Sequence, residues 1–348
     1  MKKLIAIAAM FPIFVSGVYA SGTGLDQLRG SAPAAEIAVP APGQPKGMGG
    51  DGGEVHPTGS FAAAARTAYR GNANYITLYA MPSPSDMDWS NITRLAGSAA
   101  YNALAVKLGD KHVIGHVAFE IGCTLNDGRR VTLVSGQSPS DGMGGFADQV
   151  MDGAGYNAFF GHVPGRLQTR SELEGKMDQE SNTAGDVAFL TLKVSQASCL
   201  EALRYVNAYR DEGVYKRYGL GVRPLYKEGG GCANVGVSVV EVAGPAGFEA
   251  LARPWSRTFY VPNELLGSEG DPVGAGTLLD YWKYDWTRPT AKPHKKLFFY
   301  DPDLIYKWVL HPATNMPYQR YRLNKSPGVT LDFTGASAPT QWWKTDRN

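Results

Sequence analysis

The stretch that decides the fold is Gly229-Gly230-Gly231-Cys232-Ala233-Asn234, which opens the apolar, helix-like run from Ala233 to Ala243. A thiol in the first turn of a helix lies near free backbone N–H groups and the positive end of the helix dipole, which stabilise the reactive thiolate. Glycines before it allow another backbone, such as a substrate's, to approach closely. Cys232 is therefore a candidate nucleophile, and the alternative is a small buried core residue.

A second candidate, His116, lies upstream in the strand-like run from Val113 to Ile121. A cysteine and a distant histidine supply the nucleophile and the base that acyl transfer requires. The alternative is an ordinary histidine in a strand. The two residues together indicate nucleophilic chemistry, but residue types alone do not decide between these interpretations.

The first residues have the pattern of an export signal. Lys2 and Lys3 precede an apolar run, Leu4 to Val15, that is shorter than a membrane span, and Val18-Tyr19-Ala20 is a typical signal-peptidase site. We expect residues 1–20 to be a signal peptide and the mature chain to be exported, to a periplasm or outside the cell. No integral membrane segment is expected after signal removal; the alternative is an uncleaved anchor.

The charge balance argues against two classes of partner. The chain has 34 Lys and Arg against 32 Asp and Glu. Residues 1–20 contain two of the lysines and no acidic residue, so the mature chain is balanced. Such a chain lacks the basic surface that binds nucleic acid or an anionic membrane, and we expect neither as a partner.

Composition divides the chain after the signal. Residues 21–64 are rich in Gly, Pro and Ala and are expected to form a flexible linker, because they bury little apolar surface. Residues 65–245 then read as one folded domain. Its expected strands and helices alternate, which predicts an α+β fold with an antiparallel sheet and packed helices. The expected strands are 75–80, 113–125, 130–135 and 186–194, and the expected helices begin at Asn91, at Ser195 or Ser198, and at Cys232.

Beyond residue 245 the sequence signals are weaker. Residues 246–335 are expected to form an aromatic-rich C-terminal extension packed on the domain, with a helix opened by Asp301-Pro302-Asp303. Residues 336–348 are expected to be a loose tail.

The odd number of cysteines constrains their pairing. Of Cys123, Cys199 and Cys232, at most two can form one internal bridge in an exported protein. A Cys123–Cys199 disulfide would leave Cys232 as the free thiol, whereas a bridge to Cys232 would exclude its catalytic use. Spacing does not settle this choice. His112 and His116 are too far apart along a strand to share a metal, so neither a metal nor a cofactor is expected.

The residues around both candidates resemble a known superfamily. Gly115-His116-Val117-Ala118-Phe119-Glu120-Ile121 resembles the histidine strand of papain-like hydrolases of the NlpC class. In circularly permuted members the histidine precedes the cysteine, and Gly230 to Asn234 resembles the start of their cysteine helix. The run Tyr209 to Leu225 resembles the preceding loop. The similarity spans roughly residues 70–245 and implies a circularly permuted papain-like fold with a Cys232–His116 pair.

Such a pair is completed by a polar residue on the strand next to the histidine. If Asp127 and Gly128 form a two-residue hairpin turn, Ala118 faces Gln137, diagonal to His116. A glutamine orients an imidazole through its amide oxygen, so Gln137 is the expected third residue. Glu120 is expected to be structural, and the second histidine common in lipid-acting permuted members is absent near 128–137.

The resemblance implies an exported cysteine peptidase or amidase that acts on an amide bond, with a peptide or peptidoglycan-like substrate. Cys232 would attack the carbonyl, His116 would transfer the proton, and the Cys232 N–H would help to stabilise the oxyanion. Two alternatives stay open. One is a catalytically inactive papain-like binding domain, and the other is an unrelated exported structural protein.

Overall fold

The computed structural model describes residues 61, 73–107, 115–141, 148–149, 152–183, 186–274, 285–291, 293–323 and 325–345. The expected signal peptide, and the expected linker apart from Phe61, lie outside these residues. Phe61 itself is 3% exposed, and its ring packs at 5.8 Å from that of Phe189. Phe61, which falls within the expected linker, therefore packs in the core.

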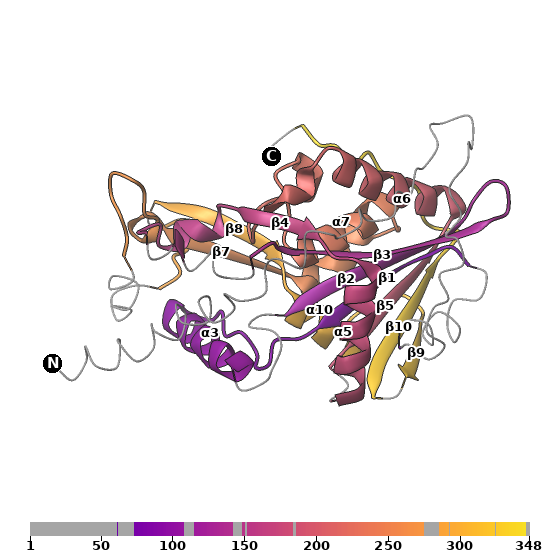
Figure 1. Ribbon diagram of the computed structural model, residues 1–348, viewed down its shortest axis with the longest axis horizontal. Coiled ribbons are helices and arrows are strands. Elements are labelled where there is room, and N and C mark those ends of the chain that lie inside the picture. The colour runs from indigo at the N-terminus through magenta and orange to yellow at the C-terminus, as the bar shows by residue number, and fades with distance from the viewer. Residues whose placement is uncertain are drawn as a thin grey trace, which may run out of the picture.

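An eight-stranded sheet forms the centre of the molecule, in the order β6-β4-β3-β2-β1-β5-β10-β9 (Figure 1). Every pair is antiparallel except β10 and β5, which are parallel. The fold is therefore α+β as expected, but the sheet is mixed rather than antiparallel. The strands are β1 Tyr75–Met81, β2 His116–Thr124, β3 Arg130–Pro139, β4 Val163–Leu167, β5 Ala188–Val194, β6 Arg217–Tyr218, β9 Tyr318–Leu323 and β10 Ser326–Phe333.

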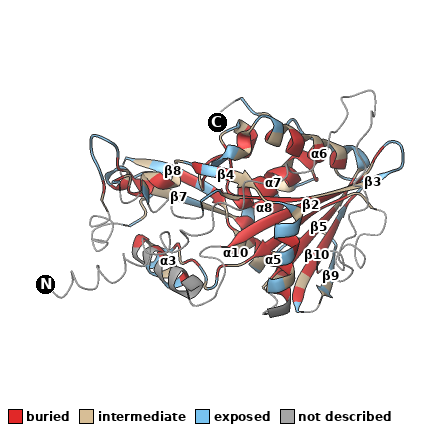
Figure 2. Cartoon of the chain, in the orientation of Figure 1, coloured by how far each residue is buried: buried red, intermediate tan, exposed pale blue. Residues whose placement is uncertain are grey.

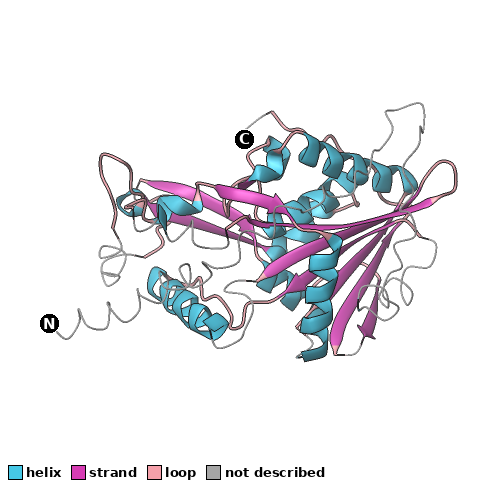
Figure 3. Cartoon of the chain, viewed as in Figure 1, coloured by secondary structure: helices cyan, strands magenta, loops and turns pink. Residues whose placement is uncertain are grey.

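Helices cover both faces of this sheet (Figure 3). Helices α6 (Gln196–Asp211), α7 (Cys232–Ala243) and α10 (Pro302–Leu310) pack on one face, and α5 (Arg170–Thr183) packs on the other. The central strands are buried on both sides (Figure 2), which explains their nearly continuous apolar sequences. Alternate residues of β2 therefore face different helices: Val117 faces α7, and Ala118 faces α5.

A smaller aromatic layer lies beside the main sheet. It contains the hairpin of β7 (Ser256–Pro262) and β8 (His294–Tyr300) and the helix α3 (Ile92–Lys107). Trp89 stacks on Phe259 with ring centroids 5.4 Å apart, and both rings belong to one apolar cluster. These aromatic side chains thus pack against one another in a core. The remaining short helices are α8 Phe248–Ala252 and 3-10 turns at Tyr156–Phe159, Val214–Lys216, Pro224–Tyr226, Arg253–Trp255 and Asn263–Leu265.

The hairpin between β2 and β3 has a different register from the expected one. Its turn has three residues, with Gly128 at φ 84° and the Leu125 N–H donating to the Arg129 carbonyl at 2.7 Å. Ala118 consequently pairs with Gly136 rather than with Gln137. A shift of one residue moves every side chain to the other face of a strand, so Gln137 lies on the α7 face.

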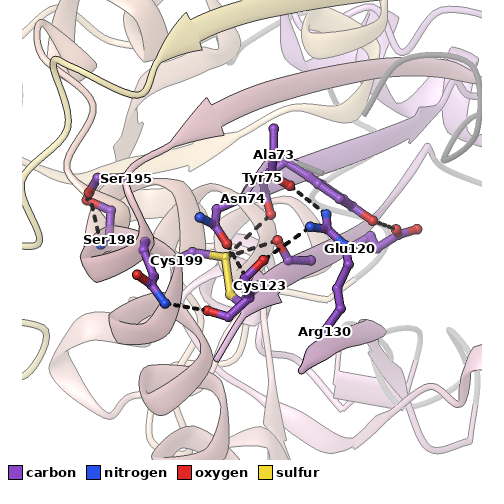
Figure 4. The surroundings of a disulfide bond; sticks show 12 residues. Ala73, Asn74, Tyr75, Glu120, Cys123, Arg130, Ser195, Ser198 and Cys199 are labelled. Carbon is purple, nitrogen blue, oxygen red and sulfur yellow. Dashed lines mark hydrogen bonds between the residues drawn. A yellow bond between two sulfur atoms is a disulfide. The ribbon is translucent and has the colours of Figure 1, made fainter. Parts of the chain in front are cut away.

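A disulfide joins Cys123 of β2 to Cys199 of α6, with their Cα atoms 5.7 Å apart (Figure 4). Ser195 begins this helix, and its side chain accepts a hydrogen bond from the Ser198 N–H. Cys232 is free and buried. The expected pairing is confirmed, and the thiol of Cys232 is not consumed by it.

The C-terminal part of the chain is more integrated than expected. Residues 246–335 supply β9 and β10 to the main sheet rather than only packing on it. The expected loose tail is wrong for residues 336–345, which lie as a strap against α6 and α7. The Thr340 N–H donates to the Val242 carbonyl at 3.0 Å, and Trp342 Nε1 donates to Glu201 at 2.6 Å. Within the described part of the chain, no helix is long and apolar enough to cross a membrane.

Candidate functional site

Cys232 is the first residue of α7, as the sequence predicted. Gly231 precedes it in an extended conformation, and its carbonyl accepts the Val235 N–H at 3.0 Å to close the first turn. No side chain caps this helix end. The Ala233 N–H acts on the thiol, whereas the Cys232 N–H donates to the Tyr218 hydroxyl.

The glycines before Cys232 are required by the packing of their own loop. Gly229 has φ +106°, and a Cβ there would lie 2.2 Å from the Arg217 carbonyl oxygen. A Cβ on Gly230 would lie 2.4 Å from a methyl group of Val235. The close backbone approach that the sequence indicated thus occurs within this chain, against the segment around Arg217.

The Cys232 thiol is enclosed by backbone groups and one phenol. Its Sγ atom lies 4.0 Å from the Gly115 carbonyl oxygen, and the residue is 6% exposed. Burial raises the pKa of the thiol, although the Val117 and Ala233 N–H groups and the Tyr218 hydroxyl favour the thiolate. The pKa of the thiol is raised overall, so the thiol is protonated at neutral pH in this conformation.

His116 begins β2, and the backbone of its two neighbours contacts the thiol. The groups that contact Sγ, the Gly115 carbonyl and the Val117 N–H, belong to the residues on either side of His116. The imidazole itself shares a face with Ala118, toward α5, whereas α7 packs on the Val117 face. The imidazole and the helix that carries the thiol therefore lie on opposite faces of β2.

Gln137 does not lie against His116, and its assignment as the third residue is wrong. Its amide oxygen accepts the Tyr209 hydroxyl at 2.5 Å. Its amide nitrogen donates to the carbonyls of Tyr215 and Arg217, both at 2.9 Å. These three bonds hold the segment before the cysteine loop against β3. The cause of the error is the hairpin register, which places Gln137 on the face opposite His116.

A different glutamine, Gln168, lies near the imidazole. A Cβ placed on Gly136 would be 2.9 Å from Oε1 of Gln168 and 3.5 Å from Nε2 of His116, so both atoms border the space that Gly136 leaves open. The Gln168 N–H donates to the Gly136 carbonyl at 2.8 Å, which fixes its backbone there. Its Oε1 is buried and, among the described residues, has no hydrogen-bond partner.

Sequence reasoning missed Gln168 because the strand before it is inconspicuous. Strand β4 has the sequence Val163-Pro164-Gly165-Arg166-Leu167, in which proline and glycine hide the strand pattern. Only its pairing with β3 brings Gln168 next to Gly136. The other missed residue, Tyr218, lies within the loop that carried the family resemblance.

A carboxylate network fixes the backbone that the thiol contacts. The Gly115 N–H donates to Ser83 Oγ at 2.9 Å, and Ser83 Oγ donates to Asp303 at 2.9 Å. Burial, and then the neighbouring Asp301, raise the pKa of Asp303. The network ties the start of β2 to the start of α10, so the position of the Gly115 carbonyl against Cys232 depends on Asp303.

Glu120, expected to be structural, is fully buried in β2. It accepts hydrogen bonds from the hydroxyls of Tyr75 at 2.5 Å and Tyr79 at 2.9 Å. These phenols occupy the carboxylate, which therefore does not serve the thiol. Within the described residues, no group of three His, Cys, Asp or Glu side chains is placed to hold a metal ion.

No described protein family, curated protein or solved structure matches this chain. Functional inference for this chain therefore rests on the geometry around Cys232 and His116 and on the motifs of its sequence.

Proposed function

We propose that this chain is an exported cysteine hydrolase with a circularly permuted papain-like fold, in which Cys232 is the nucleophile and His116 is the base. The observation that carries the proposal is the position of the thiol. It begins α7 and lies against the Gly115 carbonyl and the Val117 N–H, the backbone groups that flank His116. The thiol thus lies against the backbone on either side of the candidate base, although residues 115 and 232 are far apart in the sequence.

The imidazole has two nitrogens, and their surroundings suggest how each is used. Nε2 points toward Gly136 and Gln168, where a glutamine oxygen can accept an N–H. Nδ1 is bonded to Cγ, closer than Nε2 to the main chain of His116, whose neighbours contact the thiol. In the reaction Nδ1 would accept the thiol proton and later return it to the leaving amine, while Gln168 holds the tautomer.

The thiol needs activation before it can react. Burial keeps it protonated in the described conformation, so the thiolate would form only when the imidazole turns toward Sγ and takes the proton. The thiolate would then attack the carbonyl carbon of an amide to form a tetrahedral intermediate. The Tyr218 hydroxyl forms hydrogen bonds with both the thiol and the backbone of Cys232. It is therefore placed to donate to the resulting oxyanion.

The proposed substrate class rests on the expected export and on the family resemblance. We infer that a peptide, with a cell-wall stem peptide as the first candidate, supplies the scissile amide. The full exported chain should release new amino groups from purified peptidoglycan stem peptides, detected by mass spectrometry. Cys232→Ala should abolish this activity with the fold intact, because one small side chain replaces another.

One observation favours a second function, that of a catalytically inactive binding domain. Cys232 is 6% exposed, and burial raises the pKa of its thiol. A thiol that stays protonated and enclosed would serve only the core. If peptide, muropeptide and ester substrates are all left intact, and Cys232 remains unlabelled by iodoacetamide in the folded protein, this second function replaces the first.

A further inference from the structure

A hollow of about 420 Å³ lies between α10 and the β9 edge of the main sheet, separate from the Cys232 site. Helix α10 supplies Tyr306, Val309 and Leu310 to one wall, and residues of β9 and β10 supply the other. Its volume is in the range of small-molecule binding sites.

The wall from β9 is strongly basic. Arg320 and Arg322 are two residues apart, so they project from the same face of the strand. They pair with Val329 and Pro327 of β10, and Val329 belongs to the core that contains α10. The two guanidinium groups therefore lie on the side of the sheet that faces α10. Both arginines are exposed and line the hollow.

The third cation, Lys325, lies in the turn between β9 and β10 and also lines the hollow. No carboxylate is among the lining residues. Asp186 acts electrostatically on Tyr306, but none of the three cations has an ion-pair partner among the described residues. In contrast, Lys307 of the same helix is paired with Asp86 at 2.6 Å. The positive charge at the hollow is therefore not neutralised by described side chains.

The other wall is apolar. Val309 is 2% exposed, and Leu310 and Pro327 are half-buried beside it. A simpler role for the two arginines is to prevent the exposed β9 edge from pairing with another sheet. Cations that point into solvent would be sufficient for that role. An apolar wall facing two aligned arginines is a more specific arrangement, because guanidinium groups match carboxylates and the wall matches a hydrocarbon group.

We propose that this hollow binds a small organic dicarboxylate whose carboxylates are carried on an apolar ring or chain. Arg320 and Arg322 would bind the two carboxylates, since residues two apart in a strand are separated by about 6.8 Å. The apolar part would pack on Val309 and Leu310. The proposal is independent of the hydrolase function, because neither Cys232 nor His116 lines the hollow.

Titration calorimetry of the full exported chain with isophthalate tests this site. Isophthalamide is the neutral control of the same shape, and inorganic phosphate is the control without an apolar part. We expect saturable binding of isophthalate and at least tenfold weaker binding of both controls. The double variant Arg320→Gln/Arg322→Gln should weaken isophthalate binding at least tenfold, because it removes two charge-assisted contacts.

A matched double variant, Arg94→Gln/Arg129→Gln, changes two exposed arginines outside the hollow and should bind isophthalate as the wild type does. Circular dichroism should show both variants folded, since all four side chains are exposed. Equal loss in the two double variants would overturn the proposal in favour of general charge attraction. Equal binding of isophthalate and either control ligand, or no saturable binding at millimolar concentration, would also overturn it.

Discussion

Gln137→Ala should strongly destabilise the protein without changing the chemistry of Cys232. The side chain is fully buried and makes three hydrogen bonds, to the Tyr209 hydroxyl and to the carbonyls of Tyr215 and Arg217. Arg217 keeps a partner after the substitution, because the Gly230 N–H donates to the same carbonyl at 3.1 Å. Two groups, the buried Tyr209 hydroxyl and the partly buried Tyr215 carbonyl, lose the bond to Gln137. At about 1–3 kcal/mol each, the expected loss in the free energy of unfolding is about 3 kcal/mol or more.

Urea unfolding followed by tryptophan fluorescence measures this loss, and Gln168→Ala is the matched control. The Gln168 amide oxygen has no described hydrogen-bond partner, so its removal should cost less than about 1 kcal/mol. In the folded proteins, only Gln168→Ala should alter the rate at which Cys232 is alkylated. Equal stability of Gln137→Ala and the wild type would refute the structural assignment of Gln137. If Gln168→Ala lowered the free energy of unfolding more than Gln137→Ala does, this would refute the assignment of Gln137 as the structural glutamine and of Gln168 as the one at the site.

Three further predictions concern stability. Replacing both Cys123 and Cys199 by alanine should lower the free energy of unfolding by about 4.5 kcal/mol. This value is the entropy of closing a loop with a sequence separation of 76 in the unfolded chain. An unchanged midpoint in urea titration would contradict it. Trp342→Ala/Trp343→Ala should cost about 2 kcal/mol, because both indoles pack on α6, and an unchanged thermal midpoint would mean that the strap contributes nothing. The raised pKa of Asp303 means that the folded state binds its proton more tightly than the unfolded state, so this contribution to stability falls as the pH rises through that pKa. Between about pH 4 and pH 7, the wild type should therefore lose stability relative to Asp303→Asn, and urea midpoints that differ by the same amount at both pH values would exclude this.

Local sequence signals were sufficient for several elements. The capping residues Asn91, Ser195 and Asp301 each begin a helix, and their side chains accept hydrogen bonds from the first turn. The glycines before Cys232 marked the start of α7. In each case the information lies within a few residues. The cysteine count, in contrast, left several pairings open, of which the Cys123–Cys199 bridge is the one observed.

The third residue of the site could not be obtained in this way, because it depends on non-local pairing. The Asn126-Asp127-Gly128 sequence indicated a hairpin, but it fits turns of two and of three residues, and the difference moves Gln137 to the other face. Gln168 reaches the site only through the pairing of β4 with β3. Likewise β10 pairs in parallel with β5 after a long excursion of the chain, and no local pattern predicts that contact.

The alkylation rate of Cys232 tests most directly whether His116 activates its thiol. Iodoacetamide labelling of the folded wild type and His116→Ala should be followed near neutral pH, with mass spectrometry at Cys232. The two proteins differ only in the imidazole, so the ratio of the two rates reports its effect on the thiol. We expect the wild type to react at least tenfold faster than His116→Ala. Equal rates in the two proteins, or no labelling of either while folded, would contradict the assignment of Cys232 as the nucleophile and His116 as its base.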